Sequence, residues 1–416
     1  MLLRRTTPVR VSTKTPQPNK KKAESPVRKW VRVAHLWVGM ITGLVVFVVS
    51  ITGCLYVFEE EIRAVTYADF YFVAPRQQAE LPVDVILQKA QQLAGNEPLT
   101  QLRRKEYQPG GTFQAFLKNG QVLALNPYDG STVGTLDYSE EWLNVVQKIH
   151  TSLLLDDAGE KIIAWSTAAY FLMLLSGIVL WWPKNKKQGK RSFAVKWSAS
   201  PKRLNYDLHN VVGFYAAWIL IVVAITGLWW SFDWVKEGVY GLIGRPSFEE
   251  RPVSQPAVAS QGSVAQFPLE RAYRHALTNR QYVRQSFIQL PKAEDSTATY
   301  RVLVRYEVPR SLLRNQNTFY FDRHDYKLLR EDLYQNYNAA DAVRASNYVL
   351  HTGSMFGMAG KILAFLASFI SASLPVTGFL IWWNKRKKKK SEMRARRNDE
   401  TTPPVSHEKQ SRPPLA

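Results

Sequence analysis

Four histidines stand in register in a chain whose apolar segments repeat in pairs. His35 and His209 each begin one such segment, and His150 and His351 each precede another. Imidazole is the commonest metal ligand among protein side chains. Two histidines that face each other across a helical bundle suit haem iron, because together they fill both of its axial positions. The spacing therefore points to two candidate ligand pairs, His35 with His209 and His150 with His351.

The repeat extends beyond the histidines and needs no gap within either pair of segments. One offset is 174 positions, and it relates His35, Gly39 and Ile51-Thr52-Gly53 to His209, Gly213 and Ile225-Thr226-Gly227. The other offset is 201 positions, and it relates His150-Thr151, Gly159, Gly177 and Trp181-Trp182 to His351-Thr352, Gly360, Gly378 and Trp382-Trp383. We therefore expect two parallel repeats, each made of helix, outer domain and helix, around an axis along the membrane normal.

Four runs without Asp, Glu, Lys or Arg must position these residues. They lie at roughly 36–58, 162–182, 208–232 and 362–383. At about 1.5 Å per helical residue, each run can cross a hydrocarbon core of about 30 Å. The sequence therefore predicts a membrane protein with a four-helix transmembrane bundle.

The positive charge is concentrated beside these runs. Roughly half of the 55 Lys and Arg residues lie in three blocks, at 1–32, 184–203 and 385–397, whose only acids are Glu24 and Glu392. These blocks account for the whole net charge of +21, which argues against a nucleic-acid-binding protein. Because Lys and Arg stay on the cytoplasmic side, both termini and the loop between the second and third helices are expected in the cytoplasm of a bacterial-type inner membrane.

The two long segments between helices are then extracytoplasmic, or periplasmic. Each combines an amphipathic helix, at 81–94 or 267–278, with short alternating strands at 112–117, 121–125 and 299–306. We expect two small α+β modules without disulfides, since Cys54 is the only cysteine and lies in the first apolar run. The expected units are a basic tail (1–29), helix 1 (30–58), the first module (59–149), helix 2 with its lead-in (150–183), a cytoplasmic loop (184–207), helix 3 (208–232), the second module (233–350, with a linker at 249–266), helix 4 with its lead-in (351–384) and a basic, disordered tail (385–416).

Other interpretations of the histidines remain. A lone histidine at a helix end is usually an interfacial residue, and zinc would require four ligands or an open water position. Gly39 and Gly43 after His35, and Gly213 and Ala217 after His209, could make room for a flat cofactor or serve close helix packing. The chain has no Cys-x-x-Cys-His sequence, so any haem is non-covalent and of b type.

These residues resemble the PepSY-associated transmembrane proteins. The resemblance rests on a histidine at the start of the first helix, a Thr-Gly pair at its end, a turn of the Asn-Pro-x-x-Gly type, a second histidine and a helix ending in Gly-x-x-x-Trp-Trp. Here these elements are His35, Thr52-Gly53, Asn126-Pro127-Tyr128-Asp129-Gly130, His150 and Gly177 to Trp182. The second copy departs at the turn, where Phe321-Asp322-Arg323-His324-Asp325 contains neither Pro nor Gly.

The resemblance implies outer PepSY modules and, in the ferric-siderophore reductase branch, two bis-histidine haems b per chain, held by His35/His209 and His150/His351. It implies an oxidoreductase that passes electrons to a periplasmic ferric-siderophore. The cytoplasmic parts contain no glycine-rich nucleotide fingerprint, so the donor is expected to be a separate quinol or flavoprotein. Two alternatives belong to other classes: a membrane-anchored binding or regulatory protein whose modules hold a periplasmic partner, and an iron or siderophore permease.

Overall fold

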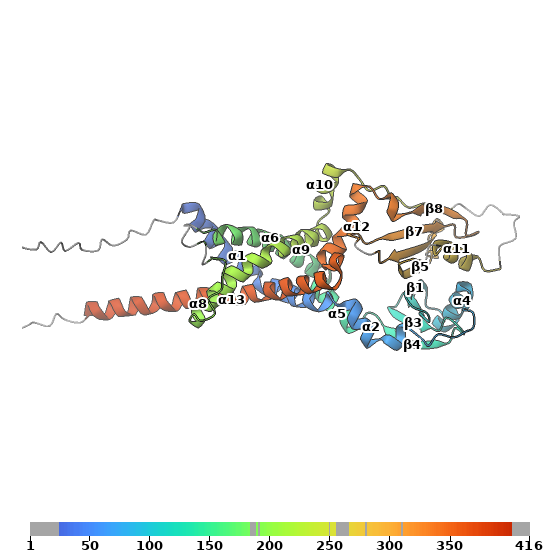
Figure 1. Cartoon of the computed structure of the whole chain (residues 1–416), viewed down its shortest axis with the longest axis horizontal. Helices are drawn as coiled ribbons and strands as arrows, with labels where there is room; N and C mark the ends of the chain where they lie inside the picture. Colours follow the sequence, from blue (N-terminus) through green and yellow to red (C-terminus); the bar gives the residue numbers. More distant parts are fainter. Residues whose placement is uncertain are drawn as a thin grey trace, which may run out of the picture.

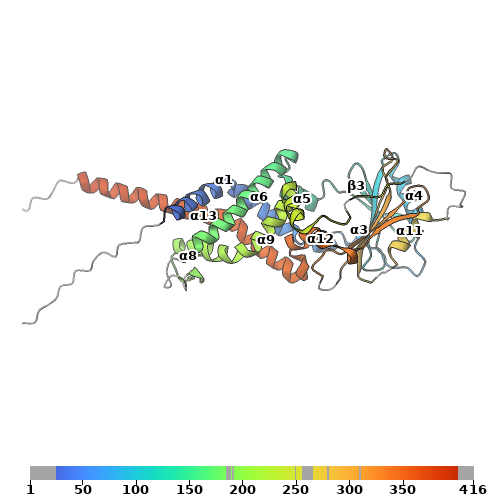
Figure 2. The ribbon, with the colours of Figure 1, turned by 90° about the horizontal axis from the view of Figure 1, so that it is seen from above.

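A computed structural model of the chain describes residues 25–183, 189, 192–248, 250–254, 266–278, 281–308 and 311–401. It places a helical bundle at one end of the molecule and a β-sheet at the other (Figures 1 and 2). The first helix begins, and the last helix ends, at the end of the bundle that points away from the sheet. We call this the tail end of the bundle, and the opposite one the sheet end.

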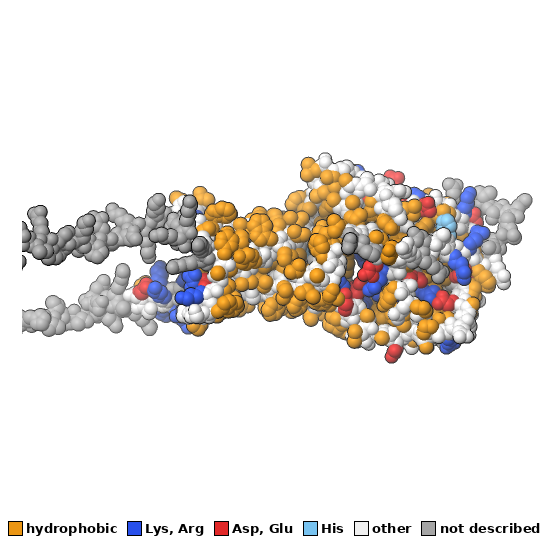
Figure 3. Space-filling view, in the orientation of Figure 1, with side chains coloured by type: hydrophobic (Ala, Val, Ile, Leu, Met, Phe, Trp, Pro, Cys, Tyr) orange, Lys and Arg blue, Asp and Glu red, His pale blue; other side chains and the backbone are white. Residues whose placement is uncertain are grey.

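Four helices among the described residues are long and apolar enough to cross a membrane. They are α1 (Pro26–Tyr56), α6 (Asp156–Trp181), the run Pro201–Ser231 and α13 (Gly357–Thr401). The third consists of α8 (Pro201–Asp207), a π-helical turn η1 (Leu208–Val212) and α9 (Gly213–Ser231). Apolar side chains cover the bundle surface between the sheet and the charged tail end (Figure 3). The prediction of four membrane helices agrees with this structure.

The helices form a closed ring of neighbours. Helix α1 packs against α6 and α13, and α9 packs against the same two helices. Helices α1 and α9 are therefore diagonal to each other, as are α6 and α13. Equivalent helices of the two halves thus face each other across the bundle.

Two helix ends differ from the sequence expectation. The third helix begins at Pro201 instead of 208, because the polar residues before the apolar run continue its helical turns. Helix α13 continues to Thr401, into the tail that was expected to be disordered from residue 385. The Lys- and Arg-rich tail from residue 385 has good helix propensity and contains no Gly or Pro before Pro403. Residues 402–416, most of the 184–191 block and most of the expected linker at 249–266 lie outside the described residues.

The second and fourth membrane helices are separated from their histidines by sharp breaks. Helix α5 (Trp142–Ser152) ends before α6, and α12 (Ala339–His351) is followed by the short helix η3 (Ser354–Phe356) and then α13. Close backbone approach makes glycine necessary after each break. A Cβ at Gly159 would lie 1.6 Å from the carbonyl oxygen of Ser152, and one at Gly360 would lie 2.0 Å from that of Gly353. The sequence left open whether these helices break; both do.

The expectation of two separate α+β modules outside the membrane requires a correction, because the strands of both segments form a single sheet. The order is β4-β3-β2-β1-β5-β6-β7-β8, antiparallel throughout. Pairing of β1 with β5 joins the two halves, which removes an exposed edge from each. The strands are β1 (Leu99–Lys105), β2 (Phe113–Leu117), β3 (Gln121–Leu125), β4 (Thr132–Asp137), β5 (Val283–Gln289), β6 (Tyr300–Tyr306), β7 (Gln316–Phe321) and β8 (Leu328–Asp332).

One face of the sheet is covered by two helices, α4 (Val83–Ala94) and α11 (Pro268–Ala276). The two helices and the strands share one apolar core, which includes Ile86 of α4, Leu269 of α11, Leu102 of β1 and Ile288 of β5. Both helices were expected at nearly these positions. The strands β1, β4, β5, β7 and β8 were not identified from the sequence.

The turns between β3 and β4 and between β7 and β8 have the same shape although their sequences differ. Asn126 N–H donates to the carbonyl oxygen of Ser131, and Asp322 N–H donates to that of Lys327, both at 2.9 Å. Tyr326 adopts a left-handed φ of 60°, where Gly130 has 67° in the first turn. The missing glycine in the second copy therefore does not change the turn.

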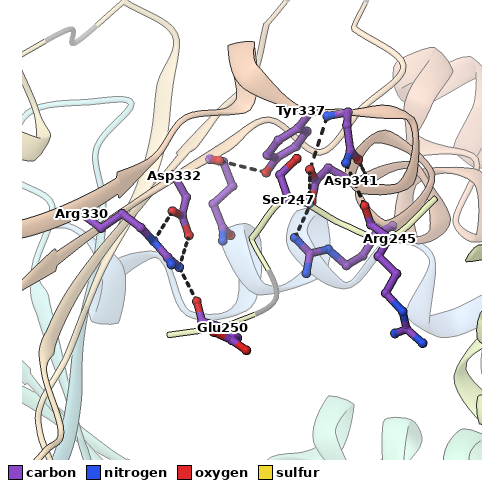
Figure 4. Close-up of polar contacts among 10 residues, drawn as sticks. Arg245, Ser247, Glu250, Arg330, Asp332, Tyr337 and Asp341 are labelled. Carbon is purple, nitrogen blue, oxygen red and sulfur yellow. Dashed lines mark hydrogen bonds and ion pairs between the residues drawn. The ribbon is translucent and has the colours of Figure 1, made fainter. Parts of the chain in front are cut away.

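Short helices connect the bundle to the sheet: α2 (Glu59–Thr66), α3 (Ala68–Tyr71) and α10 (Asp233–Ile243), with η2 (Tyr334–Asn336) before α12. The segment after α10 is tied to the second half of the sheet (Figure 4). Ser247 N–H donates to Asp341 Oδ2 at the start of α12 (3.0 Å), and Arg330 of β8 donates to the carbonyl oxygen of Glu250 (2.6 Å). Asp332 also accepts from Arg330, so this segment is held at both β8 and the start of α12.

Candidate functional site

The structure brings the repeated histidines together at the two ends of the bundle. His35 of α1 and His209 of η1 come from diagonal helices at the tail end. His150 lies in the last turn of α5 and His351 ends α12, both at the sheet end. The last two side chains thus come from the connectors between the sheet and the membrane helices.

The sheet-end rings are separated by a distance that suits a shared metal. Their centroids lie 6.2 Å apart, with an interplanar angle of 77°. An imidazole nitrogen binds a metal ion at about 2.0 Å, and the ring centre lies about 1.1 Å behind that nitrogen, so rings on opposite sides of one metal have centres about 6 Å apart. The observed spacing therefore fits two axial ligands of one metal.

A cavity of about 690 Å³ contains this pair. It extends between all four membrane helices and is lined by residues such as Val46 of α1, Ala164 of α6, Leu220 of α9 and Ala364 of α13. Volumes of about 300–1,000 Å³ with mostly apolar walls are typical of cofactor sites. The residues present fit a flat, apolar cofactor bound between two imidazoles.

Each sheet-end histidine is held by a hydroxyl group of the neighbouring helix. His150 Nδ1 lies 3.1 Å from Thr52 Oγ1, and His351 Nδ1 lies 2.9 Å from Thr226 Oγ1. Backbone carbonyl oxygens of α1 and α9 lie 3.0 and 3.1 Å from the same two nitrogens. A carbonyl oxygen only accepts, so this network places the proton on Nδ1 and leaves a lone pair on Nε2.

The tail-end histidines follow the same rule. His35 Nδ1 lies 2.7 Å from Ser176 Oγ, and His209 Nδ1 lies 2.9 Å from Thr377 Oγ1. Each hydroxyl donates its own proton to a backbone carbonyl of the preceding turn, at 2.9 Å in both cases. Its oxygen must therefore accept from the imidazole, which again leaves Nε2 free for a metal.

A glycine follows every one of these hydroxyl residues and faces the imidazole ring. A Cβ at Gly53 would lie 3.2 Å from Cε1 of His150, and one at Gly227 would lie 3.8 Å from that of His351. At the tail end the corresponding distances are 3.6 Å from Gly177 to His35 and 3.2 Å from Gly378 to His209. The four sites thus share one pattern, a histidine against a Ser-Gly or Thr-Gly pair of another helix.

Burial makes the sheet-end imidazoles neutral. It lowers the pKa of His150, and burial together with the nearby His150 lowers the pKa of His351 to about 3. Neutral imidazole is the form that binds metals. Both side chains can therefore act as ligands at physiological pH without first losing a proton.

A family model for the PepSY-associated TM region matches residues 32–385, which include all four membrane helices, both halves of the sheet and the four histidines. The chain belongs to this PepSY-associated TM family. It is thus a multi-pass membrane protein, as the four apolar helices also indicate. A comparison with curated proteins found no match.

The glycines that follow the tail-end histidines, for which the sequence left two roles open, face side chains of neighbouring helices. A Cβ at Gly39 would meet Met173 at 2.9 Å, one at Gly43 would meet Pro375 at 3.2 Å, and one at Gly213 would meet Leu374 at 3.1 Å. These residues therefore allow helices to pack closely, which was the alternative that the sequence left open. Ala217 is likewise buried in the bundle core.

The remaining candidates do not join the PepSY-associated protein's histidine pairs. His275 is exposed on α11, and Arg28 donates to the carbonyl oxygens of Leu180 and Trp182 at the end of α6. Among the described residues, no three His, Cys, Asp or Glu side chains converge as a metal-binding group, so the zinc alternative gains no further ligands. Trp181, from the repeated Trp-Trp pair, is buried, and its ring stacks on that of Phe214 with centroids 3.5 Å apart.

Proposed function

We propose that this protein carries electrons across the membrane by means of two non-covalent b-type haems, one between His35 and His209 and one between His150 and His351. The observation that carries the proposal is the repeated hydrogen bond on Nδ1, which leaves four Nε2 atoms free in two pairs. Buried hydroxyl and carbonyl partners of this kind orient metal-binding histidines and set their tautomer.

The protein's contribution is to hold and isolate the two sites. A haem ligated in this way supplies one-electron chemistry. With one imidazole of a pair on each side, a bound haem would offer no position to oxygen, and mostly apolar side chains line the sheet-end cavity. The absence of an open position favours electron relay over oxygen activation.

The direction of transfer follows from the proposed topology. We place the tail end of the bundle, with its Lys- and Arg-rich segments, in the cytoplasm of a bacterial inner membrane, and the sheet in the periplasm. The two halves of the chain are then parallel repeats whose PepSY parts share one sheet on the outside. Electrons enter from a quinol or a flavoprotein at the tail end and leave at the sheet end.

The proposed acceptor is a ferric-siderophore, which makes the protein a ferric reductase in iron acquisition. Ferric iron binds the hard oxygen ligands of siderophores, and reduction to Fe(II) weakens that attachment. This part of the proposal is supported by the family resemblance and by the location of the sheet-end site below the sheet.

The decisive experiment is a visible spectrum and a pyridine haemochrome assay of the purified protein after haem-replete expression. We expect two b-type haems per chain, and one per chain in either His209→Ala or His351→Ala. His275→Ala is the matched control, since it removes an exposed histidine of α11 and should retain both haems. A wild-type protein without b-type absorption bands would refute the proposal, and a ratio near one would leave a single site.

A further inference from the structure

The face of the sheet opposite α4 and α11 carries an arginine cluster made of Arg103, Arg305 and Arg314. Arg103 of β1 and Arg305 of β6 flank the ring of Phe287, which lies on β5 between those two strands. Their guanidinium carbons lie 5.6 and 4.3 Å from its centroid. Arg103 also lies over Phe116 at 4.0 Å. Arg314 follows in the segment just before β7.

This cluster differs from two other cations near the sheet end, Arg284 and Lys361, which have carboxylate partners. Arg284 pairs with Glu307 at 2.9 Å, and Lys361 pairs with Glu61 at 2.7 Å. Among the described residues, none of the three clustered arginines forms an ion pair within 4.0 Å. The cluster therefore has no carboxylate in direct contact, although the charge of Glu60 on α2 acts on Arg305 and Arg314.

Two further details show that the guanidinium groups of this cluster lack charged hydrogen-bond partners. Arg103 Nε is buried and has no hydrogen-bond partner, and Arg305 Nε donates only to the uncharged amide oxygen of Gln316, at 3.2 Å. Burial, reinforced by Arg314, lowers the pKa of Arg305 to about 9, so its guanidinium is still charged at neutral pH. A partly buried cationic group gains most from an anion that accepts its hydrogen bonds.

The cluster lies beside the sheet-end site. Arg314 covers the ring of Tyr348 at 4.2 Å, and Tyr348 stands one helical turn before His351 on α12. Tyr348 and His351 both line the 690 Å³ cavity. Figure 3 shows charged side chains gathered where the bundle meets the sheet. An anion held by the cluster would thus lie next to the exit of the proposed electron path.

We propose that Arg103, Arg305 and Arg314 bind the electron acceptor through its anionic oxygens, and that the acceptor is a soluble, carboxylate-bearing ferric chelate. The acceptor role rests on the proposed function; the anion site itself does not. Guanidinium groups match carboxylates in a two-pronged geometry. The aromatic rings between the arginines provide flat apolar surface for the organic part of such a chelate.

The test is calorimetric binding of gallium(III) citrate, a redox-inert mimic of the ferric chelate, to the full-length protein in neutral detergent. We expect wild-type protein to bind it and Arg305→Gln to bind at least about tenfold more weakly, as for the loss of a charge-assisted hydrogen bond. Arg305→Lys keeps the charge but loses the two-pronged hydrogen-bonding geometry of the guanidinium group, so its affinity for gallium citrate should lie between those of wild-type protein and Arg305→Gln. Arg274→Gln is the matched control, because it removes an equal charge from α11 on the opposite face of the sheet.

Three results would overturn the inference: no binding by wild-type protein, equal binding by Arg305→Gln, or displacement of the chelate by phosphatidylglycerol nanodiscs, which would assign the arginines to lipid headgroups. The visible spectrum of the same samples reports the haem sites separately. Normal b-type bands without gallium citrate binding would refute only the proposed anion site. Binding without such bands would remove the proposed haem function and keep the anion site.

Discussion

Alanine at the four ring-facing glycines should affect the histidine sites in a graded way. At Gly53 the new methyl group would lie 3.2 Å from His150 Cε1, closer than nine in ten real contacts, so the ring must move by a few tenths of an ångström. Metal sites tolerate ligand displacements of only about 0.2 Å. At Gly227, the equivalent residue of the second half, the distance is 3.8 Å and the methyl group fits.

The His150 ring cannot easily move away from a methyl group, because Thr52 and a backbone carbonyl hold its Nδ1 at 3.1 and 3.0 Å. Gly53→Ala should therefore weaken haem binding at the sheet end by about 10- to 100-fold, the usual cost of disturbing a ligand's support. Gly227→Ala should leave haem affinity unchanged and even favour the helix by about 1 kcal/mol.

The tail end provides the reverse comparison, with Gly378→Ala disruptive at 3.2 Å and Gly177→Ala tolerated at 3.6 Å. The assay is titration of haem into apo-protein, followed by visible absorption, for all four variants. Wild-type affinity in Gly53→Ala, or equal losses in Gly53→Ala and Gly227→Ala, would show that the rings are not held at these glycines as described.

Three further predictions concern topology, relay and docking. Reporter fusions at Lys187 and Gln261 should report opposite sides of the membrane, and the same side for both would contradict the proposed orientation. In His209→Ala the natural donor should no longer reduce the protein, whereas dithionite should still reduce the sheet-end haem; normal electron transfer in this variant would exclude a serial relay. In His351→Ala the donor should reduce the tail-end haem, but the ferric acceptor should reoxidise that haem poorly. Lys361→Ala removes the ion pair that holds α2 against α13, in which Lys361 Nζ lies 2.7 and 2.9 Å from the two carboxylate oxygens of Glu61. The free energy of unfolding should fall by about 1 kcal/mol, measured as a lower melting temperature that added salt does not lower further.

The sequence predicted those features that depend on long or repeated patterns. Four uninterrupted apolar runs indicated the membrane helices, and the offsets of 174 and 201 positions identified the four histidines as equivalent residues. It also identified Thr52-Gly53 and Thr226-Gly227 as repeated, although it assigned them no contact. Ser176 and Thr377 were missed because the residue types differ between the two halves, and only the following glycine repeats.

Features that depend on contacts between distant segments were not predictable in this way. Strands β1 and β5 carry arginines and glutamines among their apolar residues, so neither gives a strong alternating signal. Their pairing, with Leu102 opposite Ile288, joins segments almost two hundred positions apart. Local pattern therefore indicated two modules, whereas the tertiary structure forms one sheet.

The two histidine pairs differ in how they depend on this sheet. The tail-end pair and its hydroxyl partners all lie on the membrane-spanning helices. At the sheet end, His150 lies in the last turn of α5 and His351 ends α12, and these two helices follow the outermost strands β4 and β8. Only the hydroxyl partners of the two histidines, Thr52 and Thr226, belong to membrane-spanning helices. The chain breaks between α5 and α6 and between α12 and α13. The sheet-end site is therefore assembled by docking of the extramembrane part onto the bundle, and its geometry depends on the same sheet that carries the arginine cluster.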